Sequence, residues 1–178
     1  MDNLNEYVLT ALQIGFTAAA PFDASWLVCQ PDIRMLCAPD KCMNYGTNWI
    51  CPPGCGELPN CAARLSKYRF GLLVQSKYEK INSNDFPLMK KLAVGHNQRL
   101  QHLKEIIAGD YPDAFLLSTG RCELCEKCTY PAAPCRKPAL FRGALSAYGI
   151  DVSDLCASAG IEFSFIPGTL RYVACVLV

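Results

Sequence analysis

Apolar residues recur at the spacing of an amphipathic helix in two segments of the chain. The first covers residues 3–14 and is followed by Gly15, a residue that commonly comes directly after a helix. The second begins after Asn84 or Asp85, either of which can serve as its N-terminal cap, has Pro87 in its first turn and stops before Gly109. The pattern therefore predicts two helices, of which the second is the longer.

Shorter apolar runs bounded by turn-forming residues predict strands. Residues 69–75 and 114–118 are two such runs. Near the C-terminus, residues 161–166 and 170–178 flank a Pro-Gly pair, and this arrangement predicts a hairpin.

These elements predict an α+β fold, with a mainly antiparallel sheet and helices packed on one face. Two further short helices are expected at residues 139–148 and 151–159, because a glycine follows each. A ferredoxin-like split β–α–β arrangement is the most specific form of this fold that we consider. With 178 residues, a single domain covering residues 1–178 can bury a core without covalent crosslinks. Two cysteine-rich loops, residues 32–61 and 121–138, are expected at the edge of the sheet.

Composition narrows the class of protein. Hydrophobic residues make up 51% and charged residues 19%, which excludes a disordered chain. The net charge of +1, without a dominant cluster of Lys and Arg, argues against nucleic-acid binding. The acidic start lacks the basic and apolar regions of a signal peptide, and no apolar run approaches the roughly 18 residues of a membrane span. We therefore expect a cytoplasmic protein whose clustered cysteines are metal ligands or catalytic groups rather than disulfides.

The segment 121–138 holds four cysteines in a pattern that is typical of a metal site. It reads R-C-E-L-C-E-K-C-T-Y-P-A-A-P-C-R-K-P, so Cys122, Cys125, Cys128 and Cys135 are separated by two, two and six residues. Two-residue gaps let thiolates surround one centre while backbone N–H groups turn toward the sulfurs, as in the ferredoxin run C-x2-C-x2-C-x3-C-P. Zinc sites usually combine two separate C-x2-C pairs. The continuous run therefore favours an iron–sulfur cluster over zinc, and over reduced or disulfide-bonded cysteines.

The fourth cysteine departs from the ferredoxin pattern. A gap of six residues precedes Cys135, and Arg136 rather than proline follows it. In two-cluster ferredoxins the fourth cysteine of the run ligates the other cluster, so Cys135 belongs either to this site or to a second one. Arg121 and Arg136 flank the loop and are either counter-charges to an anionic thiolate centre or solvated loop residues.

Residues 32–61 form a second cysteine-rich segment, in which Gly and Pro prevent a regular helix or strand. Its candidate ligands, separated by four, eight and three residues, are Cys37, Cys42, Cys51 and Cys55. These spacings match no standard zinc pattern, and Cys61 lies too far after Cys55 to complete C-x3-C-x2-C. The segment is either a second metal site or a tight loop with reduced cysteines.

Other candidates for chemistry are weaker. His96 lies on the apolar stripe of the long predicted helix and is interpreted as a hydrogen-bonded core residue, and His102 as a surface residue. Cys29, Cys156 and Cys175 are expected to pack in the core. The chain contains neither a glycine-rich nucleotide-binding motif nor a G-x-S-x-G nucleophile motif.

Three segments together resemble one known family. They read I-R-M-L-C…C-M-N-Y-G-T-N-W-I-C-P-P, C-E-L-C-E-K-C…P-C-R-K-P and A-L-S-A-Y-G-I-D-V, and they span about Asp32 to Val152. In these motifs the chain resembles the predicted metal-binding proteins called domain of unknown function 2284. The resemblance implies a cysteine-bound metal of the iron–sulfur kind, in proteins typical of anaerobic bacteria and archaea, and no established reaction. The matching motifs point to Cys37, Cys42, Cys51, Cys122, Cys125, Cys128 and Cys135.

We therefore expect one or two [4Fe–4S] clusters that serve electron transfer or redox sensing in an anaerobic pathway. The expected partner is a redox protein, and neither nucleic acid nor a membrane is expected. The alternative is a zinc-binding structural or interaction module without redox chemistry. An enzyme that uses a cluster as a Lewis acid needs an iron with an open coordination position, and the sequence does not indicate one.

Overall fold

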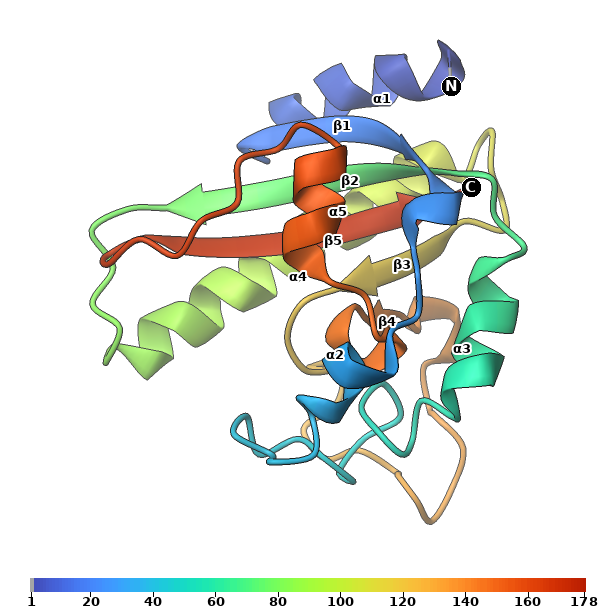
Figure 1. The fold of residues 1–178 in the computed structure, drawn as a ribbon, viewed down its shortest axis with the longest axis vertical. Coiled ribbons are helices and arrows are strands. Elements are labelled where there is room, and N and C mark those ends of the chain that lie inside the picture. Colours follow the sequence, from blue (N-terminus) through green and yellow to red (C-terminus); the bar gives the residue numbers. More distant parts are fainter. Residues whose placement is uncertain (1) are drawn as a thin grey trace.

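A five-stranded sheet organises the computed structural model, which describes residues 2–178 (Figure 1). The strands lie in the order β1-β2-β5-β3-β4. Their bounds are Ala18–Asp23 for β1, Phe70–Tyr78 for β2, Phe115–Ser118 for β3, Gly143–Ala144 for β4 and Leu170–Leu177 for β5. The pair β3–β4 is parallel and the other pairs are antiparallel. The predicted α+β fold with a mainly antiparallel sheet is confirmed.

The long helix α4, Phe86–Ile107, connects two strands that are not neighbours. Strands β2 and β3 both pair antiparallel with β5, so they run in the same direction on either side of it. The connection β2–α4–β3 around β5 is thus a split β–α–β unit. Helix α4 begins where the sequence predicted, because a carboxylate oxygen of Asp85 accepts a hydrogen bond from the N–H of Leu88 at 3.0 Å.

The long strands bury both of their faces. In β2, Leu72 and Val74 belong to one core cluster, whereas Leu73 between them belongs to the other. The first cluster is covered by α1, Asp2–Gln13, and by the buried side of α4 with Leu100. The two longest predicted helices therefore share one face of the sheet.

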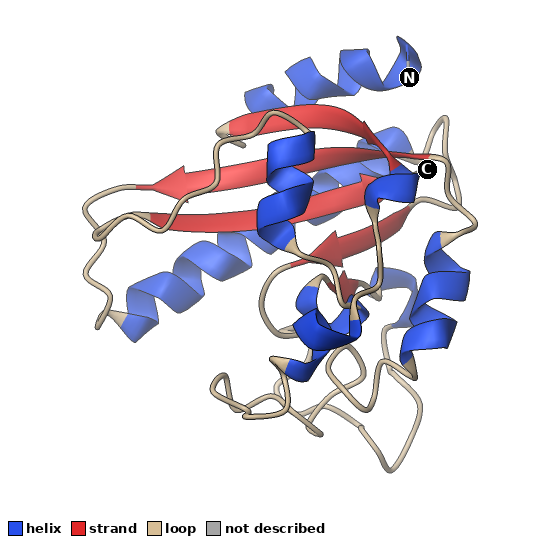
Figure 2. Ribbon diagram, in the orientation of Figure 1, coloured by secondary structure: helices blue, strands red, loops and turns tan. Residues whose placement is uncertain are grey.

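The opposite face is covered by the short helix α5, Val152–Ser158, and by the cysteine-rich segments (Figure 2). Helix α5 buries Leu155 and Cys156 in the second core cluster, and Asp151 caps its start. The remaining short elements are α2, Pro31–Met35, α3, Leu58–Leu65, and the 3-10 turns Ala24–Trp26, Pro138–Leu140 and Ser146–Tyr148. Helices thus lie on both faces, with the long pair on one and α5 on the other.

Residues 161–166 do not form the first strand of the predicted hairpin. Both edges of β5 are already paired, one with β2 and one with β3, which leaves no position beside it for another strand. The segment is an irregular connection instead, held by the side chain of Arg171. Its Nη1 donates to the carbonyl oxygen of Ser164 at 2.6 Å, and its Nη2 pairs with Glu162 at 2.9 Å.

Residues 139–148 do not form the predicted helix either. They contain strand β4 between two 3-10 turns. A Cβ atom at Gly143 would lie 2.5 Å from the side chain of Leu117 and 2.7 Å from the ring of Tyr148. The backbone can approach these side chains only at a glycine, and this tertiary requirement is not visible in the helical spacing of the segment.

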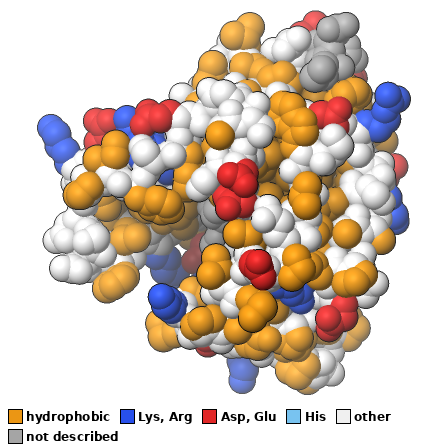
Figure 3. All heavy atoms as spheres, in the orientation of Figure 1, with side chains coloured by type: hydrophobic (Ala, Val, Ile, Leu, Met, Phe, Trp, Pro, Cys, Tyr) orange, Lys and Arg blue, Asp and Glu red, His pale blue; other side chains and the backbone are white. Residues whose placement is uncertain are grey.

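The two cysteine-rich segments lie together at the β4 end of the molecule, below the sheet in Figure 1. On the face that α5 covers, apolar and uncharged groups occupy most of the surface, and Lys and Arg side chains are scattered rather than gathered (Figure 3). Within residues 2–178, no helix is long and apolar enough to cross a membrane.

Candidate metal centre

The four cysteines of the second segment line one cavity of about 510 Å³. Cys122, Cys125, Cys128 and Cys135 are all partly buried free thiols. The first cysteine-rich segment supplies another part of the wall, over residues 44–50. The structure therefore places Cys135 at the same cavity as the three cysteines that precede it.

Two backbone N–H groups of this loop point at sulfur atoms. The N–H of Tyr130 donates to Sγ of Cys128 at 3.5 Å, and the N–H of Leu124 donates to the thiol of Cys122. In both cases the donor lies two residues after the cysteine, as the two-residue gaps predicted. Such hydrogen bonds favour the thiolate, which is the form that binds metal.

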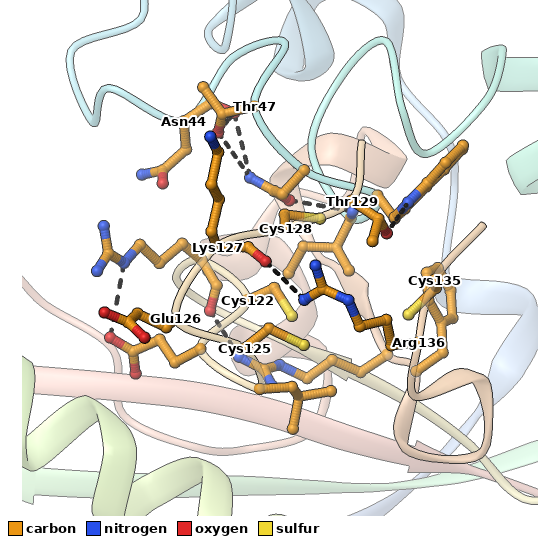
Figure 4. A pocket seen from close by; sticks show the side chains of 18 of the residues that line it. Asn44, Thr47, Cys122, Cys125, Glu126, Lys127, Cys128, Thr129, Cys135 and Arg136 are labelled. Carbon is orange, nitrogen blue, oxygen red and sulfur yellow. Dashed lines mark hydrogen bonds and ion pairs between the residues drawn. The ribbon is translucent and has the colours of Figure 1, made fainter. Parts of the chain in front are cut away.

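A basic side chain, Arg136, lines the same cavity as the four sulfurs. In Figure 4 the sulfurs of Cys122, Cys125 and Cys128 face the region that the Arg136 guanidinium occupies, and Cys135 lies on its other side. Nη1 of Arg136 donates to a backbone carbonyl oxygen of the same loop at 2.9 Å. Across residues 2–178, no three Cys, His, Asp or Glu side chains converge closely enough to hold one ion. The four sulfurs nevertheless line one cavity, and thiolates are the ligands that zinc and iron–sulfur clusters prefer.

A buried arginine, Arg142, lies between the two segments. Arg142 lines the large cavity with only 6% of its surface exposed, and its charge acts on the thiols of Cys122 and Cys51. Burial raises the pKa of the Cys122 thiol, whereas the Leu124 N–H and the Arg142 guanidinium lower it. The sequence analysis did not single out Arg142.

Three cysteines of the first segment line a smaller cavity of about 180 Å³. They are Cys37, Cys42 and Cys51. Asn44 and Arg121 line both cavities, so the two groups of cysteines adjoin one another. Burial raises the pKa of the Cys37 and Cys51 thiols. The predicted grouping of these three residues is therefore found in the structure.

Polar side chains, rather than regular elements, hold the first segment in place. Oδ1 of Asp40 accepts hydrogen bonds from the N–H groups of Asn44 at 2.7 Å and Tyr45 at 2.8 Å. Oδ1 of Asn48 accepts from the N–H groups of Ile50 and Cys51, both at 3.1 Å. Such side-chain-to-backbone bonds fix the loop between α2 and α3, which its Gly and Pro residues keep from forming a helix or strand.

Cys55 lies elsewhere, against Cys61 at the start of α3. The two thiols share a hydrogen bond, which lowers the pKa of Cys61 and raises that of Cys55. Nη1 of Arg34 lies 3.7 Å from Sγ of Cys61 and also donates to the carbonyl oxygen of Ala147 at 3.0 Å. The structure thus separates Cys55 from the small cavity with which its spacing associated it. A gap of five residues between Cys55 and Cys61 was the only sequence signal for this pair.

The residues assigned to packing occupy the predicted places. His96 is fully buried and its Nδ1 lies 2.9 Å from Oγ of Ser76, whereas His102 is exposed. Cys156 and Cys175 are fully buried, and Cys29 is partly buried against the same core cluster.

Comparison with known proteins agrees with the geometry of the site. A family model described as predicted metal-binding protein (DUF2284) matches residues 20–178, which include both cysteine-rich segments. No curated protein and no solved structure matches the chain.

Proposed function

The chain belongs to the DUF2284 family of predicted metal-binding proteins, and on this basis we propose that it is an iron–sulfur protein. In this proposal Cys122, Cys125, Cys128 and Cys135 hold a [4Fe–4S] cluster. The protein uses the cluster for electron transfer or redox sensing in an anaerobic pathway.

The observation that carries the proposal is the common cavity of the four thiols. A bound cluster supplies one-electron chemistry, and its potential depends on hydrogen bonds to the sulfurs, nearby charge and exposure to solvent. The N–H groups of Leu124 and Tyr130 supply two such hydrogen bonds. Trp49 and Phe141 line the cavity and limit the access of water to it. Arg136 contributes a positive charge to the wall of the same cavity.

Cys37, Cys42 and Cys51 are the proposed ligands of a second metal site. They share a cavity that adjoins the first one, and Cys51 is buried. Cys55, which the spacing also suggested, is directed at Cys61 and joins this set only if its loop moves. The second site is therefore proposed from three cysteines.

A redox partner protein is the proposed source or acceptor of electrons. The second segment reaches the surface, where Glu126 and Lys127 are exposed next to the partly buried Cys125. A partner that docks on this loop comes close to the proposed cluster without any rearrangement of the core.

The test is an absorption spectrum of protein purified without oxygen, with iron, sulfide and zinc measured on the same sample. We expect a broad visible band that a reductant bleaches, with about four irons and four sulfides for each cluster. Twice that content identifies the second group of cysteines as another cluster. Colourless protein with stoichiometric zinc, which also fails to take up iron and sulfide on reconstitution, contradicts the proposal and supports a zinc-binding structural or interaction module.

A further inference from the structure

Arg142 is a buried cation without a dedicated anion. It lines the large cavity and is 6% exposed. Its Nη2 donates to the carbonyl oxygen of Arg121 at 2.7 Å, and its Nε has no hydrogen-bond partner in the described part of the chain. Among residues 2–178, no ion pair includes Arg142. A guanidinium that is removed from water without a counter-charge lowers stability, unless an anion reaches it.

The nearby acidic side chains do not form an ion pair with Arg142. The carboxylate of Glu123 pairs with Arg121 at 3.6 Å. Burial lowers the pKa of Arg142, although the charges of Cys122, Glu123 and Cys51 oppose this shift. The guanidinium therefore offers hydrogen-bond donors and charge to the cavity.

Basic side chains also outnumber carboxylates along the rest of the cavity. Lys90 of helix α4, Arg121, Lys127 and Arg136 line it together with Arg142, against two carboxylates from Glu123 and Glu126. A concave wall with an excess of one charge concentrates ligands of the opposite charge. The cavity is thus electrostatically suited to an anion.

Size and lining indicate what kind of anion fits. The volume of about 510 Å³ lies in the range of sites for small organic molecules. Trp49, Ile50, Val94 and Phe141 provide an apolar part of the wall. Arginine recognises carboxylates and phosphates through paired N–H donors.

We propose that this cavity binds a small organic oxyanion, with its carboxylate or phosphate group on Arg142 and its apolar part against Trp49 and Phe141. The ligand would lie beside Cys122, within reach of the cysteine group. The proposal depends on Arg142 and the cavity and not on the identity of the metal, so it can fail or succeed independently of the iron–sulfur proposal.

The test is calorimetric titration of the purified protein, with its metal content recorded, using benzoate, phenyl phosphate and benzyl alcohol. We expect saturable binding of one molecule of benzoate or phenyl phosphate per chain, and none of the neutral benzyl alcohol. The oxyanion that binds more tightly identifies the natural group as carboxylate or phosphate. Absence of binding of both up to about 10 mM, or equal binding of benzyl alcohol, overturns the proposal.

Matched variants locate the site. Arg142→Gln should weaken binding at least tenfold, because one charged donor is lost. Arg69→Gln removes the same charge from an exposed position outside the cavity and should leave binding unchanged. Unchanged affinity in folded Arg142→Gln overturns the proposal. If this variant does not fold, a crystal structure of the unaltered protein with phenyl phosphate decides, because an anion bound anywhere but on Arg142 contradicts the assignment.

One further outcome would show that Arg142 serves only as a counter-charge to the thiols. If folded Arg142→Gln loses metal while the unaltered protein binds neither anion, the arginine serves as a counter-charge to the cysteine group, and the oxyanion site is rejected.

Discussion

Trp49 and Tyr130 pack edge to face, with their ring centroids 4.9 Å apart and their ring planes at 89°. Trp49 belongs to the first cysteine-rich segment and Tyr130 to the second. Nε1 of Trp49 also donates a hydrogen bond to Oγ1 of Thr129 at 3.3 Å. A Cβ atom at Gly54 would lie 3.0 Å from the ring of Tyr130, so the backbone of the first segment also packs closely against it. These contacts join two segments that are distant in the sequence.

We predict that Trp49→Ala loosens the second segment. The change removes the aromatic contact and the hydrogen bond to Thr129, and should lower the free energy of unfolding by about 1–3 kcal/mol. Hydrogen exchange should accelerate over residues 121–138 more than in the strands of the sheet.

Trp26→Ala is the matched control for this change. Trp26 packs near Phe22, away from the cavity, and is 43% exposed. Its removal should leave exchange over residues 121–138 unaltered. Equal exchange of that segment in Trp49→Ala and the unaltered protein would show that the Trp49 contacts do not hold the two segments together.

His96 should make stability depend on pH. Burial, followed by the charges of Arg99 and Arg142, lowers the pKa of His96 to about 3, from an ordinary value of 6.5. Between these values the unfolded chain binds a proton at this residue and the folded chain does not, so stability is fully present above about pH 6.5 and falls as the pH drops toward 3. The contribution at stake is on the order of 4 kcal/mol. Urea unfolding at a series of pH values measures it.

Two substitutions separate His96 from the carboxylates that also titrate at low pH. His96→Gln should flatten the decline in stability between pH 6.5 and about 4.5. His102→Gln, at an exposed position of the same helix, should leave the decline as it is. A slope that is identical in the His96 variant and the unaltered protein would rule out the buried neutral histidine.

Gly143→Ala should lower the free energy of unfolding by about 1–3 kcal/mol, since the added methyl overlaps Leu117 and the ring of Tyr148. Gly95→Ala, within α4, places a methyl group where there is room for it. Apart from the adjoining residues and the helix's own backbone, the nearest atom is on the side chain of Arg99, 3.9 Å away. That change should raise stability by about 0.5–1 kcal/mol. Chemical denaturation of both variants checks the prediction, and a neutral effect at Gly143 would contradict the close packing of β4.

The sequence predicted most reliably the elements whose formation depends on local residues. Helix α4 has its cap at Asp85, and β2 has an apolar run, so both lie close to the predicted bounds. The prediction of a hairpin with residues 161–166 as its first strand was wrong, because the pairing of β5 with both neighbours depends on segments far along the chain. The prediction of a helix over residues 139–148 was wrong for a similar reason, because Gly143 lets the backbone approach the ring of Tyr148 closely.

In the candidate site, too, the features that depend on local residues were predicted and those that depend on distant segments were not. The two-residue gaps predicted that N–H groups point at the sulfurs, and this follows from local geometry. Cys122, Cys125 and Cys128 line one cavity, and the prediction that they share a metal centre stays a prediction. The pairing of Cys55 with Cys61 depends on how α3 packs against Arg34, and no spacing rule contains that information.

The central claim is that the cysteines of residues 121–138 hold an iron–sulfur cluster. Its most direct test is the iron and sulfide content of Cys125→Ala after purification without oxygen. The matched control is Cys175→Ala, which makes the same substitution at a buried cysteine in strand β5. We predict that Cys125→Ala loses most of its iron, sulfide and visible absorption, whereas Cys175→Ala keeps them. Iron and sulfide in Cys125→Ala equal to those of the unaltered protein would contradict the assignment of the cluster to this loop.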